Sequence, residues 1–394
     1  QWWDTNNRAH VVVGARSTVN GGHCDDNRDT LNGFPIDCPR QEGTLATTNP
    51  FVAGPDHYSP IGVVNRFDLA PSDGANCGQY RIAFGKDSGL TNDKDRNLVI
   101  FEAVLPNPDP SRGIDACAPI ARFWDRLSDV GDGGASIAGL LDTFYFTGLP
   151  GFEPVVAADH YGAKGGSDTG QIRANQFMED VSYLGGAPLH QGWELREYRL
   201  QHMPNSKNLV IRLDSVKNNP SPSLIGGTDQ LSLQFQEAFL EQVPSLSASS
   251  PNLIAMTTAL QFNAGQSREQ TFTDQYEHAN PSAAFLNQIQ ASIPPAAGLT
   301  APDILARADT QSCQGCHVGE GGKNLGGGVT WPANDNGFVQ ITESSRLSSA
   351  LTGTFLPFRK QVLESFLTAE CLPHTLSAGD PTTTIAGGKV GAAN

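Results

Sequence analysis

The sequence predicts an α+β protein, in which a loop-rich N-terminal domain with β-strands and some helices is followed by a small all-α domain. Apolar runs rich in β-branched residues occur before residue 220, whereas apolar residues at helical spacing begin after residue 229. Gly (42) and Pro (26) are numerous and only 38% of the residues are hydrophobic, as is typical of a loop-rich chain. The 394 residues are enough for two domains. We place the boundary at the Pro294-Pro295 linker, with domains at 1–292 and 299–394.

Two segments of the N-terminal domain predict β-hairpins. In the first, residues 78–108, an alternating run at 80–84 precedes the apolar run 97–105. The second, residues 196–220, repeats the order Tyr-Arg-apolar, then Asn-Leu-Val-Ile, then Asn-Pro. We therefore expect two related hairpins that are neighbours in one antiparallel sheet. Similar composition of unrelated strands is the alternative, and two copies are too few for a solenoid.

Helices are predicted where apolar residues recur at spacings of three and four. The helix that starts near Thr300 has the clearest start signal, because Thr300 can cap it, Pro302 fits its first turn and Asp303 completes a capping box. The predicted helical segments are 137–146, 233–243, 285–289, 300–308 and 356–367.

The charge of the chain excludes some classes of partner. Lys and Arg number 26 and Asp and Glu 41, which gives a net charge of −15. A nucleic-acid surface needs clustered basic residues, and so does docking on anionic lipid, so neither is expected. No run of 18 apolar residues occurs, so no transmembrane segment is expected. The acidic surface favours solubility, with bound cations or a cationic partner as the alternative.

The first four cysteines are spaced as two disulfide pairs. Cys24 and Cys38 enclose a polar loop, and Cys77 and Cys117 enclose the first hairpin and its exit. Loops of this size suit disulfides in an oxidising compartment, so we expect an extracytoplasmic protein: periplasmic, secreted or on the cell surface. Spacing does not fix connectivity, and buried thiols are the alternative.

The loop after Cys24 is a candidate calcium site. Asp25, Asn27 and Asp29 place oxygen atoms at alternate positions, which resembles half of a calcium-binding loop. The closing Glu of such a loop is missing, and an ordinary polar turn explains the same residues.

A Cys-x-x-Cys-His motif stands out near the C-terminus, formed by Cys313, Cys316 and His317. With a helix before it and an amphipathic helix at 356–367 after it, residues 299–370 resemble a c-type cytochrome domain. The resemblance implies a covalent haem c, held by thioethers from Cys313 and Cys316, with His317 as the proximal ligand of the iron. The C-terminal domain is then expected to be cytochrome c-like. The N-terminal region resembles no family that we can name.

Two other interpretations of the motif stay open. Cys-x-x-Cys is also a redox disulfide motif, but that context requires a strand before the motif, where a helix is predicted here. A zinc site needs further ligands, and Cys371 and His374 are the ones nearby in sequence. If the motif holds haem, Cys371 has no obvious pairing partner.

The sixth iron ligand is not evident. Small electron-transfer cytochromes place a Met after the motif, but no Met follows Met256. His374 is the one downstream His, and the upstream candidates are His202, Met203 and Met256. Trp331 and Phe355 are candidate haem-wall residues, although core packing would explain both.

Three functions are compatible with these features. The first is electron transfer through the haem, with the large N-terminal domain docking a redox partner protein or an extracellular acceptor, or assembling with further copies. The second is a haem enzyme, a peroxidase or an oxygenase, that uses an open iron site, with His202, Arg199 or Arg359 as the distal polar group. The third is a binding or structural protein with incidental haem. No hydrolase signature is found.

Overall fold

The computed structural model describes residues 10–12, 30–36, 49–130, 134–163, 169–178, 192–203, 205, 208–269 and 275–371. Some of the residues singled out above lie outside these ranges. They are Cys24, Asp25, Asn27, Asp29, Cys38 and His374. The expected first disulfide, the candidate calcium loop and one candidate for the sixth ligand therefore stay predictions.

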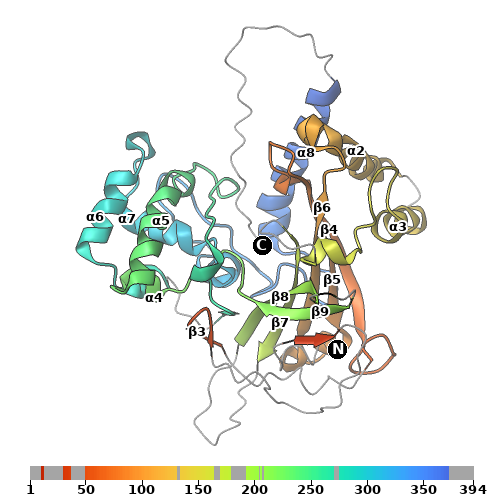
Figure 1. Ribbon diagram of the computed structural model, residues 1–394, viewed down its shortest axis with the longest axis horizontal. Coiled ribbons are helices and arrows are strands. Elements are labelled where there is room, and N and C mark those ends of the chain that lie inside the picture. Colours follow the sequence, from red (N-terminus) through yellow and green to blue (C-terminus); the bar gives the residue numbers. More distant parts are fainter. Residues whose placement is uncertain are drawn as a thin grey trace, which may run out of the picture.

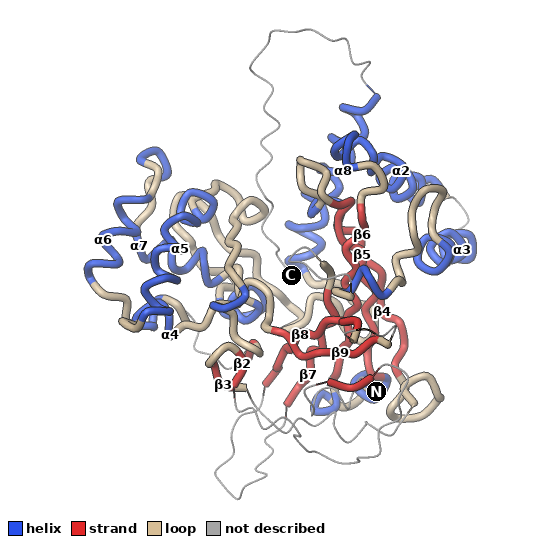
Figure 2. The backbone as a smooth tube through the Cα atoms, in the orientation of Figure 1, coloured by secondary structure: helices blue, strands red, loops and turns tan. Residues whose placement is uncertain are grey.

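An antiparallel sheet forms the centre of the molecule (Figures 1 and 2). Its strand order is β1-β9-β8-β7-β6-β5-β4, and β10 also pairs with β8. The strands are β1 His10–Val12, β4 Tyr58–Arg66, β5 Asn76–Lys86, β6 Asn97–Pro106, β7 Gln171–Met178, β8 Gly192–His202, β9 Leu209–Asp214 and β10 Ser267–Arg268. A separate two-stranded sheet pairs β2, Thr30–Leu31, with β3, Phe34–Pro35.

Both predicted hairpins are confirmed as antiparallel pairs of this one sheet. In the first, β5 pairs with β6, with Arg81 opposite Glu102. In the second, β8 pairs with β9, with Arg199 opposite Arg212. The expectation that the two hairpins are neighbours is wrong, because β7 lies between β6 and β8. The segment 171–178 was not expected as a strand, since its polar residues give it no apolar run.

The two faces of the sheet have different chemistry, because alternate residues of a strand point to opposite faces. One face carries Tyr80, Ile82 and Ala103 and packs against helical residues such as Phe123 and Phe144. Tyr80 meets Phe144 edge to face at 5.1 Å between ring centroids. The opposite face carries a row of charged residues, described below, together with a smaller apolar cluster that includes C-terminal residues. We call these the aromatic face and the ionic face.

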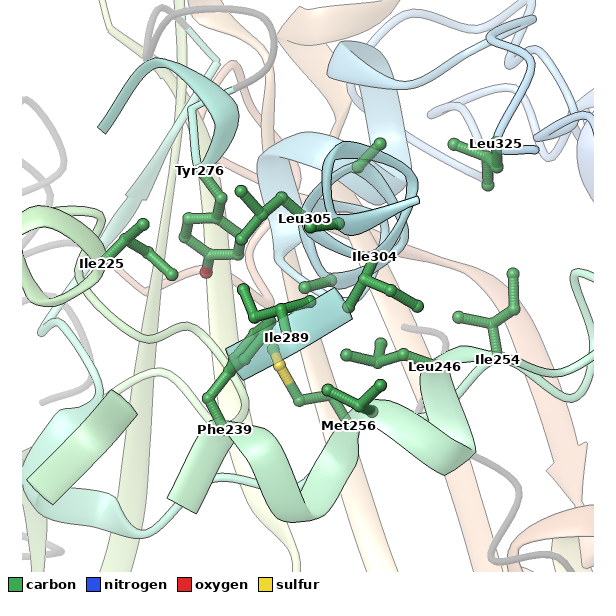
Figure 3. Close-up of a cluster of buried hydrophobic side chains, with 14 of the residues drawn as sticks. Ile225, Phe239, Leu246, Ile254, Met256, Tyr276, Ile289, Ile304, Leu305 and Leu325 are labelled. Carbon is green, nitrogen blue, oxygen red and sulfur yellow. The ribbon is translucent and has the colours of Figure 1, made fainter. Parts of the chain in front are cut away.

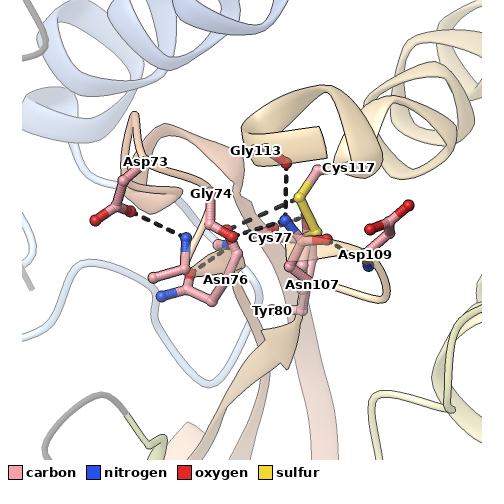
Figure 4. The surroundings of a disulfide bond; sticks show 11 residues. Asp73, Gly74, Asn76, Cys77, Tyr80, Asn107, Asp109, Gly113 and Cys117 are labelled. Atoms are coloured by element: carbon pink, nitrogen blue, oxygen red, sulfur yellow. Dashed lines mark hydrogen bonds between the residues drawn. A yellow bond between two sulfur atoms is a disulfide. The ribbon is translucent and has the colours of Figure 1, made fainter. Parts of the chain in front are cut away.

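The predicted disulfide between Cys77 and Cys117 is confirmed. It joins β5 to the helical turn η5, Pro110–Cys117, which precedes α2 (Figure 4). The Nδ2 atom of Asn107 donates to the carbonyl oxygens of Gly74, at 2.7 Å, and Gly113, at 2.8 Å. The disulfide and these hydrogen bonds hold the loops at this end of the sheet together.

A second core forms among helices that follow the sheet in sequence (Figure 3). These are α4 Ser223–Gly226, α5 Gln230–Leu246, α6 Ala283–Ser292 and α7 Ala301–Asp309. The predicted segments 233–243, 285–289 and 300–308 correspond to α5, α6 and α7. The expected boundary at Pro294-Pro295 lies between α6 and α7, and Ile289 and Ile304 from these two helices belong to the same cluster. Residues before and after that linker thus share one core.

The last helix, α8 at Leu356–Cys371, lies beside α2, Ala118–Arg126, rather than beside the helices of the second core (Figure 1). Its residues Leu363 and Phe366 pack on the aromatic-face cluster. Phe366 meets Phe67 with a ring separation of 4.9 Å. The C-terminal segment therefore reaches from the helical core to the sheet, and the α+β class is confirmed for the molecule as a whole.

The remaining helical elements are short. They include α3 Gly134–Asp142, which continues into η7 Thr143–Thr147 and corresponds to the predicted helix at 137–146. The others are η2 Phe67–Leu69, η3 Asp87–Leu90, η4 Asp93–Asp95, η6 Leu127–Asp129, η8 Ala158–Tyr161, η9 Leu260–Phe262, η10 Glu277–Ala279, η11 Pro295–Ala297, η12 Gly315–Gly319 and η13 Leu351–Phe355. Within the described ranges, no helix has both the length and the apolar character needed to cross a membrane.

Candidate functional site

Helix α7 and the turn after it present the Cys-x-x-Cys-His motif. The predicted capping box is present: Asp303 Oδ2 accepts a hydrogen bond from the Thr300 backbone N–H at 2.8 Å, and Thr300 Oγ1 accepts one from the Asp303 N–H. After α7 the chain folds back into the π-helical turn η12. A Cβ at Gly315 would lie 2.0 Å from the Asp309 carbonyl oxygen, so this close approach requires glycine.

The motif cysteines are buried thiols that belong to different apolar clusters. Cys313 is fully buried beside the ionic face of the sheet, in a cluster with Trp193, Phe338 and Val339. Cys316 belongs to the helical core. The motif therefore lies where the helical core and the sheet meet.

His317 is buried with an unusual lack of partners. It is 8% exposed, and neither Nδ1 nor Nε2 makes a hydrogen bond of ordinary geometry to a described residue, the looser contact with the Phe338 backbone aside. Its ring stacks on Phe338 at 5.2 Å between centroids. Burial lowers the pKa of His317 to about 4; the positive charges of Arg173 and Arg81 act in the same direction, and the backbone at Phe338 opposes them. The imidazole is therefore neutral at neutral pH, which is the form that binds a metal.

Trp331 fixes the backbone of the motif. Its Nε1–H donates a hydrogen bond to the Cys316 carbonyl oxygen at 3.1 Å, and its side chain is fully buried. The Trp331 ring lies 5.7 Å from the ring of Phe355. Both residues were named as candidate haem-wall residues, and both lie in the same cluster as Cys316. They line the helical side of the motif.

A buried carboxyl pair adjoins the motif and was not foreseen from the sequence. Asp309 Oδ1 accepts hydrogen bonds from Gln275 Nε2 at 2.9 Å and from Ser312 Oγ at 3.2 Å. Burial raises the pKa of Asp309 to about 7, although hydrogen bonds from Gln275 and Ser312, and the hydrogen bond it shares with Glu320, oppose the increase. Glu320 is itself fully buried and forms an ion pair with Lys323 at 3.1 Å. Asp309 thus stays protonated at pH values at which an ordinary Asp carboxyl is ionised.

The ionic face carries a row of buried ion pairs that crosses four strands. Arg81 pairs with Glu102 at 3.1 Å, Glu102 with Arg173 at 3.5 Å, and Arg173 with Glu197 at 3.2 Å. Arg199 extends the row. Burial alone would raise the pKa of Glu102, but Arg173 and Arg81 outweigh it and lower that pKa. Arg81 and Arg199 each follow a Tyr in the repeated strings of the two hairpins. That repeat is the feature of the sequence that indicates a shared role for these two arginines.

The other candidates for iron ligation or distal chemistry are dispersed. His202 is half-exposed and lies 3.4 Å from Asp159, and Met256 is buried in the helical core (Figure 3). Met203 follows β8, and its backbone N–H donates to the Asn208 carbonyl oxygen. By contrast, Arg359 is partly buried and lies near the motif: its guanidinium is 6.0 Å from the ring of Phe355, which packs against Trp331.

The described residues contain no group of three or more His, Cys, Asp and Glu side chains that could hold a metal ion. Comparison of the chain with protein-family models, with curated proteins and with solved structures gave no match.

Proposed function

We propose that this chain is a c-type haem protein, with haem attached to Cys313 and Cys316 through thioether bonds and His317 as the proximal ligand of the iron. The observation that carries the proposal is His317, a buried imidazole whose two nitrogens make no hydrogen bond of ordinary geometry to a described residue. A buried polar group without a partner costs about 1–3 kcal/mol. Iron coordination would satisfy one nitrogen, and the neutral imidazole is ready to bind it.

The surroundings of the two thiols fit this group better than a redox disulfide or zinc. Helix α7 precedes the motif, whereas a thioredoxin-like disulfide follows a strand. Cys313 and Cys316 belong to different apolar clusters, and an apolar setting suits a large porphyrin ring. The cytochrome c-like character of residues 299–394 belongs to this same proposal.

Haem would supply one-electron chemistry when bound. The residues of the chain would bind and orient the haem. His317 would bind it through its imidazole, and stacking on Phe338 fixes the plane of that ring. Trp331 holds the motif backbone through the Cys316 carbonyl. Trp193 and Phe338 exclude water from the sheet side. Electron transfer to a redox partner protein or an extracellular acceptor is the role we propose.

The Cys77–Cys117 disulfide supports an extracytoplasmic location within this proposal. Disulfides persist in oxidising compartments, and covalent haem together with a disulfide fits the periplasm, the cell surface or secretion. Self-assembly and calcium binding stay predictions.

The first test is an absorption spectrum of protein made with the haem-attachment machinery. We expect a Soret band and, in alkaline pyridine after reduction, the α-band typical of thioether-linked haem. The variant Cys313→Ala/Cys316→Ala should lose covalent haem completely, while Ser349→Ala, an exposed change in the same segment, should retain it. Absence of a Soret band in the unmodified protein would refute the proposal.

A haem enzyme is the second candidate, and the partly buried Arg359 near Cys316 is the observation that favours it. A cationic group close to an open iron site could polarise bound peroxide. Binding of cyanide to the oxidised protein and carbon monoxide to the reduced protein would support this candidate. If neither binds, electron transfer is favoured.

A further inference from the structure

Arg359 is a partly buried cation, and one carboxylate, shared with Arg66, lies near it. It lies in the first turn of α8, and its side chain is only 10% exposed. The nearest carboxylate is that of Asp68, at 4.0 Å, and the guanidinium carbon lies 6.0 Å from the Phe355 ring centroid. At 4.0 Å the pair with Asp68 is too long for a hydrogen bond, so the Arg359 guanidinium has donors to spare for a further acceptor. Burying a charged group in this way is costly unless it is paired.

Asp68 balances Arg359 only in part, because Arg66 binds the same carboxylate more closely. The Nε and Nη2 atoms of Arg66 donate to the Asp68 carboxylate at 3.0 and 2.9 Å, which is a bidentate pair. Arg81 lies nearby, with its Nη atoms on Glu102 and Gln79, and its buried Nε has no hydrogen-bond partner among the described residues. Arg66, Arg81 and Arg359 therefore form an arginine cluster that shares the carboxylates of Asp68 and Glu102.

The repulsion within this cluster is reflected in the pKa values. Burial lowers the pKa of Arg359 to about 9, and Arg66 and Arg81 add to the decrease. Burial also lowers the pKa of Arg81 to about 10; Arg66 and Arg173 act in the same direction, and Glu102 opposes them. A carboxylate beside Arg359 would reverse both trends and would accept the unused N–H groups.

The cluster adjoins the haem-attachment motif. The guanidinium of Arg359 lies 6.0 Å from the Phe355 ring, and that ring lies 5.7 Å from Trp331, whose Nε1–H donates to the Cys316 carbonyl. Haem carries two carboxylates, its propionates. A guanidinium matches a carboxylate geometrically, since two parallel N–H groups bind its two oxygens.

We propose that Arg359, supported by Arg81, binds a carboxylate, and that this carboxylate is a propionate of the haem attached at Cys313 and Cys316. The inference rests on the proposed function. A small dicarboxylate from solution has the same chemistry, and the experiment separates the two sources.

The test uses the full chain with haem attached and measures the midpoint potential by spectroelectrochemical titration. Removal of a cation next to haem favours the ferric state, so Arg359→Gln should lower the potential. We expect a change of about tenfold in the ferric-to-ferrous ratio, or 59 mV for one electron. Lys360→Gln removes a charge from the next residue, which is 74% exposed, and should shift the potential by less than a third as much.

A second readout identifies contact with the propionate. An adjacent cation holds the pKa of a carboxylate down by about 1–3 units, so the potential of Arg359→Gln should become more dependent on pH between about pH 5 and 8. Arg359→Lys keeps the charge and should restore most of the potential. It also serves as the informative variant if Arg359→Gln does not fold.

The outcomes distinguish failure of the propionate assignment from failure of the proposed haem function. If haem is attached but Arg359→Gln and Lys360→Gln shift the potential equally, the propionate assignment is wrong and the proposed function stands. If calorimetry shows that succinate binds to the unmodified protein and not to Arg359→Gln, while the potential is unchanged, the carboxylate comes from solution and the propionate assignment is again wrong. If no haem is attached, the proposed function itself fails.

Discussion

The aromatic and ionic faces of the sheet are both buried, but they are buried by different parts of the chain and for different reasons. The aromatic face brings Tyr80 and Phe144 together with the α2 region, and apolar burial of this kind stabilises a fold directly. The ionic face buries Arg81, Glu102 and Arg173 beneath the segment that carries the motif. Buried ion pairs contribute little net stability, since desolvation offsets their attraction.

This difference indicates where function resides. A face that only needed to be covered could have been apolar, because replacing buried ion pairs by hydrophobic residues is often neutral or stabilising. The ionic face instead places charges close to His317 and Cys313. We infer that its charges are kept for the chemistry of the motif, and the following predictions test that comparison.

The largest effect is expected from breaking the ionic row at its centre. Glu102→Gln removes the carboxylate shared by Arg81 and Arg173, and it leaves both guanidinium groups buried without that charge. We expect a loss of about 3–5 kcal/mol in the free energy of unfolding, measured in urea. The midpoint potential of attached haem should rise, since removal of a nearby anion disfavours the ferric state.

Phe144→Ala is the matched change on the aromatic face. It should lose about 3–5 kcal/mol as well, through the cavity that it creates. It should leave the potential unchanged. If the two variants alter the potential to the same extent, the functional difference between the faces does not exist.

The sequence could predict features that depend on nearby residues. The capping box at Thr300 and Asp303 and the strands of both hairpins are encoded within a few positions. The spacing of Cys77 and Cys117 suggested their pairing, which the structure confirms, but did not fix it. The motif could likewise be found from Cys313, Cys316 and His317 alone, because a fixed local spacing defines it.

Features that depend on distant segments could not be predicted. Alternation in β5 places Arg81 and Tyr80 on opposite faces, but it does not show that residues more than 200 positions later, such as Phe338, pack on the face of Arg81. The placement of β7 between the hairpins depends on pairing that its own residues do not signal. Phe338, which stacks on His317, and Arg359, which approaches Cys316, are ordinary residues until tertiary packing brings them to the motif.

A smaller, pH-dependent effect is expected from Asp309 beside the motif. The pKa of Asp309 is raised to about 7 in the folded chain, from an ordinary value of 3.8. Between these values the folded protein keeps a proton that the unfolded chain has lost. Stability should therefore fall as pH rises through this window, by up to ~1.4 kcal/mol per pH unit.

Urea unfolding of the unmodified protein and of Asp309→Asn, measured from pH 4 to pH 8, tests this effect. Asn keeps the shape and cannot ionise, so the variant should show a smaller dependence on pH and should be more stable than the unmodified protein at pH 8. An unchanged slope in Asp309→Asn would assign the pH dependence to other groups.

The smallest effect is expected at the start of α7. A substitution there weakens the helix that precedes the motif and leaves the residues around the motif unchanged. Thr300→Ala removes the side-chain cap, whose hydroxyl pairs with Asp303, at an exposed position. The loss should be about 1 kcal/mol in the free energy of unfolding. The haem spectrum and potential should not change, because the ionic face, Phe338 and Trp331 still hold the motif. If this distant change shifts the potential as far as Glu102→Gln does, the motif responds to general loosening of the fold, and the charges of the ionic face have no special role.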